Sequence, residues 1–307
     1  MPQFPVIDSH VHLYDPAALP YGWLRGDPVL DRRRSLPEFD AANAGPPPVT
    51  VERLVFVEAA VDPGRHHDEA AQAQAWADAD PRIAAIVAHC PVERGAAVEE
   101  DLARLGRLRC LRGVRRLIQG EVDPGVCLEP GFVAGVRAVG RAGLSFDLCV
   151  KHWGLVFAAE LARRCPGTQF VLDHIGKPGI AHGLREPWWS QLREIAMLPN
   201  VACKLSGVVT EADHATWTPA QIVPYVAHAI DCFGFDRLMY GSDWPVAELT
   251  HRIPAWVALI EQATAGCGAH ETQALFRGTA TRVYRLDAPG GDGFAAAAPT
   301  TLARPAR

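Results

Sequence analysis

Four residues in this sequence combine side-chain types and positions that could carry out acid–base chemistry. His10 and His12 stand two apart near the N-terminus, His174 lies in Val-Leu-Asp-His-Ile-Gly-Lys-Pro, and Asp243 lies in Tyr-Gly-Ser-Asp-Trp-Pro. Residues two apart on a β-strand point to the same side, so the two N-terminal imidazoles face one space together. Because an unpaired imidazole is costly to bury, such a pair in a buried strand indicates a functional site. Three imidazoles and a carboxylate could activate water and polarise a carbonyl, or hold a divalent metal.

Asp243 is the candidate general base of this set. It directly follows an apolar run and precedes Trp244 and Pro245. We expect these apolar neighbours to raise the pKa of its carboxyl, as a general base requires. The competing interpretation is that Asp243 caps a short helix after Pro245. For His174 the competing interpretation is that it pairs, like Asp173, with the local backbone only.

A second group of polar and aromatic residues stands at or near the ends of predicted strands and could bind a substrate. The predicted substrate-binding set is Arg115, Lys151, His152, Lys204 and Trp244. Trp153 and either Tyr14 or Trp23 could also stack on the apolar face of a ring. Glu58 and His89 are weaker candidates at the ends of the second and third strands. The rim of a barrel is polar in any case, so none of these residues identifies a site by itself.

The candidate residues recur at the C-terminal ends of eight short apolar runs rich in Val, Ile, Leu and Phe, which predicts parallel strands buried on both faces. The runs are residues 6–12, 53–60, 83–90, 111–117, 145–151, 169–176, 201–207 and 237–244. Segments with helical spacing lie between most of them, at 68–78, 97–108, 132–142, 155–164, 188–198 and 219–233. This alternation over roughly 250 residues predicts an α/β fold, a single-domain (β/α)8 TIM barrel, whose strand ends meet on one face.

The alternative architecture is an open doubly wound sheet, which usually carries a glycine-rich phosphate loop after its first strand. Here the first strand ends in His-Val-His-Leu, and no G-x-G-x-x-G or Walker-type loop follows. The barrel is therefore favoured, over residues 1–286. The connection at 13–49 is long enough to be a functional lid over the active face. We expect residues 287–307, rich in Ala, Pro, Gly and Thr, to form a disordered tail.

Composition and charge exclude several classes of function. Of the 307 residues, 49% are hydrophobic and 21% are charged, and the net charge is −5. Arg and Lys are mostly scattered, so the sequence has no electrostatic footprint for nucleic acid or an anionic membrane. No apolar run could span a bilayer and the first strand begins too early for a signal peptide, so we expect a cytoplasmic protein. The 8 cysteines form no C-x-x-C pair, and several lie in apolar strands, which predicts buried free thiols.

Six motifs in combination resemble the amidohydrolase superfamily, over about residues 6–286. They are Ile-Asp-Ser-His-Val-His at 7–12, Leu-Arg-Gly-Val-Arg-Arg-Leu-Ile-Gln at 111–119, Phe-Asp-Leu-Cys at 146–149, Val-Leu-Asp-His-Ile-Gly-Lys-Pro at 171–178, Cys-Lys-Leu-Ser-Gly at 203–207 and Tyr-Gly-Ser-Asp-Trp-Pro-Val at 240–246. Within the superfamily the sequence is most similar to the branch of L-fuconolactonases and L-rhamnonolactonases, and more distantly to 2-pyrone-4,6-dicarboxylate lactonases. The resemblance implies that Asp243 activates water while His10, His12 and His174 bind the lactone carbonyl.

The resemblance leaves the metal requirement open. The wider superfamily holds one or two divalent ions on histidines of strands one and six, a ligand of strand five and the aspartate of strand eight, whereas the lactonase branch often works without a metal. If a zinc ion is present, its predicted ligands are His10, His12, His152 and Asp243. Arg115 and Arg116 stand at the end of strand four instead of a carboxylated lysine, so a binuclear centre is not expected.

The resemblance and the residues together favour hydrolysis of an aldonolactone to its hydroxy acid, without a required cofactor. A dicarboxylate substrate would call for several converging arginines, and mainly Arg115 and Lys151 stand at strand ends, so a neutral sugar lactone is preferred. The alternatives are a zinc-dependent decarboxylase, a lactone isomerase and a noncatalytic protein that binds sugar acids. The expected partner is a small-molecule lactone, and association with copies of the same chain stays open.

Overall fold

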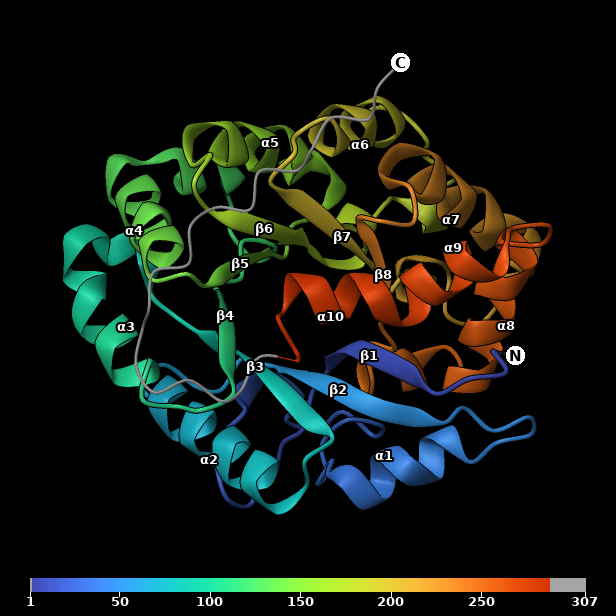
Figure 1. Ribbon diagram of the computed structural model, residues 1–307, viewed down its shortest axis with the longest axis horizontal. Helices are drawn as coiled ribbons and strands as arrows, with labels where there is room; N and C mark the ends of the chain where they lie inside the picture. The colour runs from blue at the N-terminus through green and yellow to red at the C-terminus, as the bar shows by residue number, and fades with distance from the viewer. Residues whose placement is uncertain (1, 288–307) are drawn as a thin grey trace.

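A computed structural model describes residues 2–287 of the chain, and its eight strands form one sheet in chain order (Figure 1). Every neighbouring pair is parallel. The strands are β1 (Val6–Val11), β2 (Val51–Val57), β3 (Ile83–His89), β4 (Leu111–Arg115), β5 (Ser145–Leu148), β6 (Gln169–Leu172), β7 (Val201–Leu205) and β8 (Leu238–Tyr240). The number and direction of the strands confirm the predicted (β/α)8 barrel.

Backbone hydrogen bonds between the segment after β8 and β1 close the barrel. The amide of His12 donates to the carbonyl of Trp244 at 2.8 Å, and the amide of Asp243 donates to the carbonyl of His10 at 3.0 Å. The carboxylate of Asp8 also joins this seam, because it accepts from the amide of Ser242 at 2.8 Å. The two ends of the sheet, and with them the first and last candidate catalytic residues, are thereby held side by side.

All eight strands end earlier than the sequence predicts, and the difference is largest in β6 and β8, which leave the sheet just before a candidate catalytic residue. β6 ends at Leu172 rather than at residue 176, and β8 ends at Tyr240 rather than at residue 244. The backbone φ angle is 55° at His174 and 59° at Asp243. A positive φ is uncommon for residues other than glycine and persists only where the surroundings enforce it. These turns end the strand pairing and place both side chains at the mouth of the barrel.

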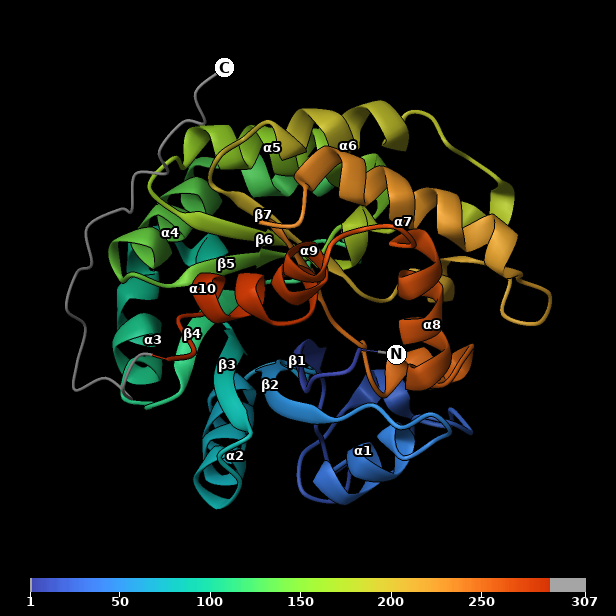
Figure 2. The same ribbon diagram turned by 45° about the vertical axis from the view of Figure 1, so that its right-hand side comes forward.

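In the part of the chain that the structure describes, ten α-helices accompany the strands, most of them around the outside of the barrel (Figures 1 and 2). They are α1 (Leu36–Asn43), α2 (His66–Ala79), α3 (Val98–Leu105), α4 (Pro130–Arg141), α5 (Leu155–Arg164), α6 (Trp188–Ala196), α7 (Pro219–Phe233), α8 (Ile253–Ala263), α9 (Ala269–Gln273) and α10 (Thr279–Val283). α7 begins where Thr218 and Gln221 form a capping box and ends before Gly234. No helix within residues 2–287 is both long enough and apolar enough to cross a membrane.

Short helical turns fill the connections between these elements. The 3-10 turns are η1 (Gly22–Leu24), η2 (Val92–Ala97), η3 (Pro124–Leu128), η4 (His152–Gly154), η5 (Asp173–Gly176), η6 (Ile180–His182), η7 (Val209–Glu211) and η8 (Val246–Leu249), and η9 (Ala274–Gly278) is a π-helical turn. All 8 cysteines are free and six are buried, as predicted.

The interior of the barrel consists of an apolar layer below a polar one. The apolar layer includes Ile7, Val55, Val87 and Met239 and packs against Tyr284 just after α10. Figure 1 shows α10, in red, lying across the ring of strands. Above this layer the buried interior side chains are charged, among them Arg115, Asp147, Asp173 and Lys204. The apolar layer and α10 close the N-terminal end, so the open end of the barrel is the one that carries the candidate site.

The long connection at 13–49 is packed against the barrel. It contains η1 and α1, and it has a small core of its own in which Tyr14, Leu19, Tyr21, Leu24 and Leu30 pack on Ala59. This core fixes the segment next to the loop that follows β2. The predicted disordered tail, apart from residue 287, lies outside the described residues.

Candidate active site

A cavity of about 400 Å³ opens at the C-terminal ends of the strands. Three of the four predicted catalytic residues, His12, His174 and Asp243, line it, and His10 lies fully buried against them. The rest of the wall comes mainly from loops after the strands and consists of Trp23, Ala59, Ala60, Val61, Asp62, Pro63, Arg115, Leu117, Gln119, Cys149, Lys177 and Val246. The barrel therefore gathers candidate residues from both ends of the sequence at one opening.

The three predicted histidines surround one carboxylate oxygen of Asp243. Oδ1 of Asp243 lies 3.5 Å from Nε2 of His12, 3.7 Å from Nε2 of His10 and 3.9 Å from Nε2 of His174. The two nitrogens of His10 and His12 are themselves 3.2 Å apart. The ring centroids of His10 and His174 lie 4.5 Å apart. A single small group at the centre could contact all four side chains.

The contacts below the cavity orient the imidazoles of His10 and His12. Nδ1 of His12 is 2.9 Å from the carbonyl oxygen of Val57, which can only accept, so Nδ1 carries a proton. Nδ1 of His10 lies 3.2 Å from the ammonium of Lys204 and 3.3 Å from Oδ1 of Asp173. Nε2 of His10 lies 3.2 Å from Nε2 of His12 and 3.5 Å from a guanidinium nitrogen of Arg115. In its neutral form His12 therefore directs the lone pair of Nε2 toward the centre of the site.

His12 and Asp243 present two acceptors to each other across 3.5 Å. Two lone pairs at this distance repel unless a proton, a water molecule or a cation lies between them. The cavity reaches both side chains, so a small ligand can enter the space between them. The site is thus built to bind a hydrogen-bond donor or a positive ion next to a carboxylate.

The prediction of a raised pKa for Asp243 is wrong. Burial does raise the pKa, but the imidazoles of His174, His12 and His10 outweigh it and hold the pKa of this carboxyl well below its usual range. Burial also lowers the pKa of His174 to about 4 and that of His10 well below its ordinary value. The imidazoles, rather than the apolar Trp244, are the groups that surround the carboxylate. At neutral pH the site therefore contains an ionised Asp243 beside neutral His10 and His174.

The loop after β7 allows Asp243 and His174 to approach each other. Gly207 has a φ of 55°, and a Cβ atom there would lie 2.6 Å from Oδ2 of Asp243 and 2.6 Å from Nδ1 of His174. A side chain at this position would push both groups out of place. The neighbouring Ser206 places its hydroxyl 2.9 Å from Nδ1 of His174, so the imidazole bonds a side chain rather than only local backbone.

The side chain of Asp243 does not cap a helix, and the side chain of Asp173 is not limited to contacts with the local backbone. The short turn after Pro245 has no side-chain cap, and Asp243 supports it only with its backbone carbonyl, which accepts from Ala247. Asp173 forms ion pairs with Arg115 at 3.1 Å and with Lys204 at 3.1 Å. Both aspartates are therefore tied to groups from other strands.

Lys204, predicted to bind substrate, lies below the cavity and is fully buried. Its ammonium contacts Asp147 at 2.6 Å, Asp173 at 3.1 Å and Nδ1 of His10 at 3.2 Å. The hydroxyl of Tyr284 donates to the same oxygen of Asp147 at 2.8 Å. Burial raises the pKa of Asp147 to about 6, although Lys204 opposes this. Lys204 thus supports His10 from beneath and has no surface left for a substrate.

Arg115 lines the cavity, as predicted, but its guanidinium is already paired. Nε donates to the carboxylate of Glu58 at 2.7 Å, and one terminal nitrogen donates to Asp173 at 3.1 Å. That same nitrogen lies 3.5 Å from Nε2 of His10. Burial lowers the pKa of Arg115, but the charges of Glu58 and Asp173 outweigh it and raise the pKa. Arg115 therefore carries a permanent positive charge next to His10, but its guanidinium is not free to bind a substrate carboxylate.

The structure does not bring the other three predicted substrate-binding residues to the cavity wall. Lys151 pairs with Glu211 at 3.1 Å beside it. His152 directs Nδ1 to the carbonyl of Lys177 at 3.2 Å, in η4 after β5. Trp244 is fully buried, packs on Phe39 with ring centroids 5.4 Å apart and donates to Glu248 at 2.8 Å. Each of the three side chains is thus engaged with another part of the protein.

Several functional neighbours were missed by reasoning from the sequence. Asp147 is absent from the predicted site, Asp173 enters the sequence analysis only as the neighbour of His174, and Glu58 is a weak candidate there, although each is an acidic residue inside an apolar run. An unexplained charge in a strand buried on both faces is the signal that could have found them. Gln119 and Lys177 follow strand ends and carry no such signal.

The side chains at the centre fit a metal ion, with one change to the predicted set. His10, His12 and Asp243 offer three ligand atoms within 4.8 Å of one another. Their separations of 3.2, 3.5 and 3.7 Å match the edge of roughly 3.4 Å that a tetrahedral zinc shell requires. His152 is not part of the potential metal-binding groups found among residues 2–287, because its ring turns toward Lys177.

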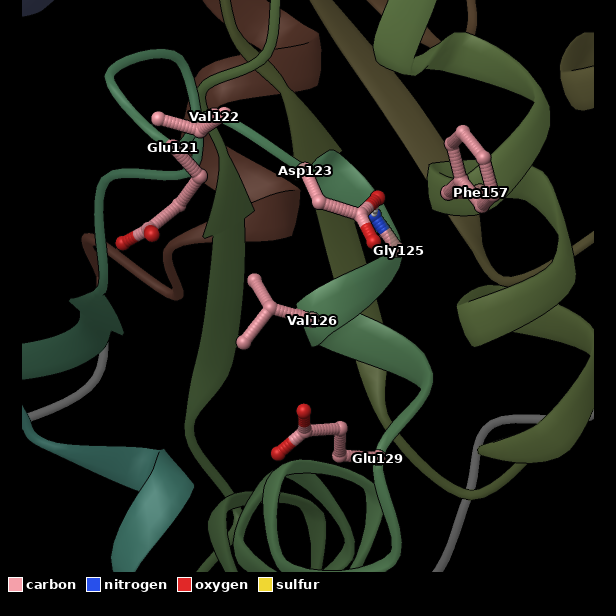
Figure 3. A pocket seen from close by; sticks show the side chains of 7 residues that line it. All are labelled: Glu121, Val122, Asp123, Gly125, Val126, Glu129 and Phe157. Atoms are coloured by element: carbon pink, nitrogen blue, oxygen red, sulfur yellow. Dashed lines mark hydrogen bonds between the residues drawn. The ribbon is translucent and has the colours of Figure 1, made fainter.

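A larger hollow of about 530 Å³ lies on the surface near η3, away from these groups (Figure 3). Three acidic residues, Glu121, Asp123 and Glu129, line it together with Val126 and with Phe157 of α5. Asp123 accepts from the amide of Gly125 at 2.7 Å, so it caps its own turn. No histidine, cysteine or lysine lines this hollow, whereas the smaller cavity at the strand ends is lined by three of the four predicted catalytic residues.

The chain matches one protein family and several of its members over most of its length. L-fucono-1,5-lactonase of Burkholderia multivorans is 33% identical over 294 residues, which cover 92% of this chain and 97% of that protein. L-fucono-1,5-lactonase of Burkholderia ambifaria is 38% identical over 197 residues, 62% of this chain and 67% of that protein. A crystal structure of an amidohydrolase from Burkholderia multivorans with bound zinc superposes with a TM-score of 0.81 at 33% identity, covering 92% of this chain and 99% of that one.

The family match agrees with the position of the site. The amidohydrolase family aligns with residues 7–286, which include β1 with its two histidines and reach past β8 and its aspartate. The resemblance inferred from the six motifs is thereby confirmed. Because one match takes in the whole barrel together with the residues at its mouth, the chain belongs to the amidohydrolase family.

Proposed function

We propose that this protein hydrolyses a sugar lactone to the corresponding hydroxy acid. The observation that carries the proposal is the ionised carboxylate of Asp243 held 3.5 Å from the lone pair of His12 at the wall of a cavity. This arrangement positions a water molecule that donates to both acceptors. Two relatives that are 33% and 38% identical are L-fucono-1,5-lactonases, which supports a lactone as the substrate.

In the proposed reaction Asp243 accepts a proton from water while the water oxygen bonds to the lactone carbonyl carbon. The developing oxyanion accepts hydrogen bonds from the imidazoles of His10 and His174, and the nearby guanidinium of Arg115 stabilises its charge. The bond from this carbon to the ring oxygen then breaks, and Asp243 returns its proton to that oxygen. A low pKa makes Asp243 a modest base but a strong acid once protonated, which favours this last transfer.

These residues supply a base and carbonyl donors by themselves, so the proposed reaction does not require a cofactor. If a zinc ion binds, His10, His12 and Asp243 would hold it, and it would supply a Lewis acid for the carbonyl. His174 and Arg115 would still face the substrate from the same positions.

We infer a neutral sugar lactone rather than a dicarboxylate. The two cationic residues in the cavity wall are both engaged: Arg115 with Glu58 and Asp173, and Lys177 with Glu211 at 3.3 Å. A second substrate carboxylate would have to displace one of these buried pairs, which is costly. The part of the wall formed by Trp23 and residues 59–63 is largely apolar and suits the carbon face of a sugar ring.

The test is hydrolysis of a panel of aldono-1,4- and aldono-1,5-lactones, followed by proton release, before and after chelation. We expect Asp243→Asn to lose at least about 10²-fold in kcat, the lower range for a lost general base. His152→Asn, whose residue lies outside the cavity wall, is the matched control and should retain turnover and its response to chelation.

Each outcome separates the alternatives. Turnover that survives chelation and fails in Asp243→Asn supports the metal-independent reaction. Turnover that chelation abolishes and zinc restores assigns His10, His12 and Asp243 to a required metal shell. A product of unchanged mass would identify an isomerase, and release of carbon dioxide from an acid substrate would identify a decarboxylase. No turnover on any lactone would contradict the proposal.

A further inference from the structure

A second cluster of potential metal ligands lies outside the candidate active site. His66 and His67 are the first two residues of α2, and Asp101 projects from α3. Each offers a ligand atom, and the three atoms lie within 4.8 Å of one another. The exposed fractions of the three side chains are 18%, 14% and 8%, so the cluster is largely shielded from water yet open to a small ion. None of the three lines the catalytic cavity.

The separations in this cluster fit a zinc shell. Oδ1 of Asp101 lies 3.5 Å from Nε2 of His66 and 3.1 Å from Nε2 of His67. Zinc bonds of about 2.0–2.2 Å to nitrogen and oxygen in a tetrahedron separate the ligand atoms by roughly 3.4 Å. Two imidazoles and one carboxylate leave the fourth position for water. The two rings also lie close together, with centroids 4.2 Å apart.

A simple hydrogen-bonded pair explains only part of the cluster. His67 can donate to Oδ1 of Asp101 at 3.1 Å. Nε2 of His66 is buried as well, points to the same oxygen, and has no hydrogen-bond partner among the described residues. A buried polar atom without a partner is costly, and such exceptions often mark an absent ion or water. An ion at this point would satisfy both imidazoles and the carboxylate together.

Arg94 holds the carboxylate in position. Its guanidinium pairs with Oδ2 of Asp101 at 2.6 Å, which leaves Oδ1 turned toward the imidazoles. Outer partners of this kind orient carboxylate ligands in metal sites. The ring of His89, at the end of β3, lies edge-on to His66 with centroids 5.4 Å apart and limits its rotation. The ligand atoms are therefore preorganised without an ion.

We propose that His66, His67 and Asp101 form a structural zinc site that joins α2 to α3. The segment 59–63, which lines the catalytic cavity, ends three residues before His66. Zinc at the start of α2 would anchor the end of that segment to α3. The proposal is independent of the lactonase proposal, since it concerns binding at different residues.

The test is zinc binding to the full-length protein, measured by competition with a chromophoric chelator. His67→Ala and Asp101→Asn should each remove one zinc equivalent that the parent binds, with a loss of affinity beyond the roughly tenfold that removal of an outer partner causes. His270→Ala, a histidine exposed on α9, is the matched control and should bind as the parent does. The same measurement in a His12→Ala background removes the contribution of the catalytic residues.

A diffraction measurement on the parent protein tests the zinc site without relying on variants that could fail to fold. Crystals of the parent protein grown with zinc should show an anomalous peak between His66, His67 and Asp101. Unchanged zinc stoichiometry in both His67→Ala and Asp101→Asn would overturn the proposal, as would the absence of that peak. A peak only at His10, His12 and Asp243 would likewise overturn it while leaving the catalytic proposal intact.

Discussion

The ammonium nitrogen of Lys204 lies 3.2 Å from Nδ1 of His10, beneath the candidate active site. Nδ1 of His10 also lies 3.3 Å from Oδ1 of Asp173, so a buried cation and a buried anion hold the same ring nitrogen. The same ammonium neutralises two buried carboxylates, Asp147 at 2.6 Å and Asp173 at 3.1 Å. One side chain from β7 therefore links the charge balance of the barrel interior to the orientation of a catalytic imidazole.

Replacing Lys204 by Met keeps most of the side-chain volume but removes this charge. We expect the free energy of unfolding to fall by about 3–5 kcal/mol, because breaking a buried ion pair leaves uncompensated charges. Urea denaturation measures this change. Lys151→Met is the matched control: Lys151 pairs with Glu211 while 32% exposed, and its loss should cost less than about 1 kcal/mol. Equal small effects in the two variants would show that Lys204 does not carry the buried charge balance.

Gly207→Ala tests the contact between the β7 loop and the catalytic pair. The new Cβ would lie 2.6 Å from both Asp243 and His174, so we expect kcat/KM to fall by roughly 10²-fold, the effect of misplacing reacting groups by about 1 Å. Gly183→Ala is the control, since its φ of 63° imposes similar backbone strain but a Cβ there meets nothing within 4 Å. Steady-state kinetics on the preferred lactone distinguish them. Similar losses in both variants would indicate general strain rather than the contact.

Trp23→Ala tests the apolar wall of the cavity. The indole lines the opening, is 48% exposed and is held by a 2.8 Å hydrogen bond to the carbonyl of Ala59. Its loss removes binding shared by substrate and transition state, so KM should rise about tenfold, equivalent to ~1.4 kcal/mol, with little change in kcat. Trp153→Ala, 52% exposed but outside the cavity wall, should leave both constants near the parent values. A change in kcat alone would contradict a binding role for Trp23.

Glu69→Gln tests a buried carboxyl behind the cavity wall. Burial and the charge of Glu58 raise the pKa of Glu69 to about 8, so the folded protein keeps this group protonated. Its stabilising contribution is full below the ordinary pKa of 4.5 and is lost as the pH rises toward 8, at about 1.4 kcal/mol per unit of pKa difference. Gln mimics the protonated form, so the stability of the variant relative to the parent should increase between pH 5 and pH 8.

The measurement for Glu69→Gln is urea denaturation at several pH values across that range. Glu194→Gln makes the same chemical change on the exposed face of α6 and is the control. Its stability relative to the parent should stay nearly constant with pH. If both variants behave alike, Glu69 is ionised in the folded protein and the inferred charge state is incorrect.

The sequence by itself determined the barrel and the four residues at its centre. Strand alternation is a local property, so the spacing of His10 and His12 predicts that both lie on one face. The apolar runs before His174 and Asp243 predict that these residues lie at the ends of strands. The common direction of the strands then required the four to meet at one mouth. Individual strand ends were less certain, because the left-handed turns at His174 and Asp243 are enforced by tertiary contacts.

Only the tertiary structure decided the charge states and the supporting contacts of these residues. The pKa of Asp243 depends on imidazoles from two other strands rather than on its neighbour Trp244, and the proton of His12 depends on the carbonyl of Val57 in β2. Lys204 is predicted to bind substrate but lies in the interior, where it pairs with Asp147 and Asp173. The pattern of a strand determines which face of the sheet a side chain lies on, but not which charged groups lie next to it. Electrostatic energies depend on the distances to those groups, so they follow only from the tertiary structure.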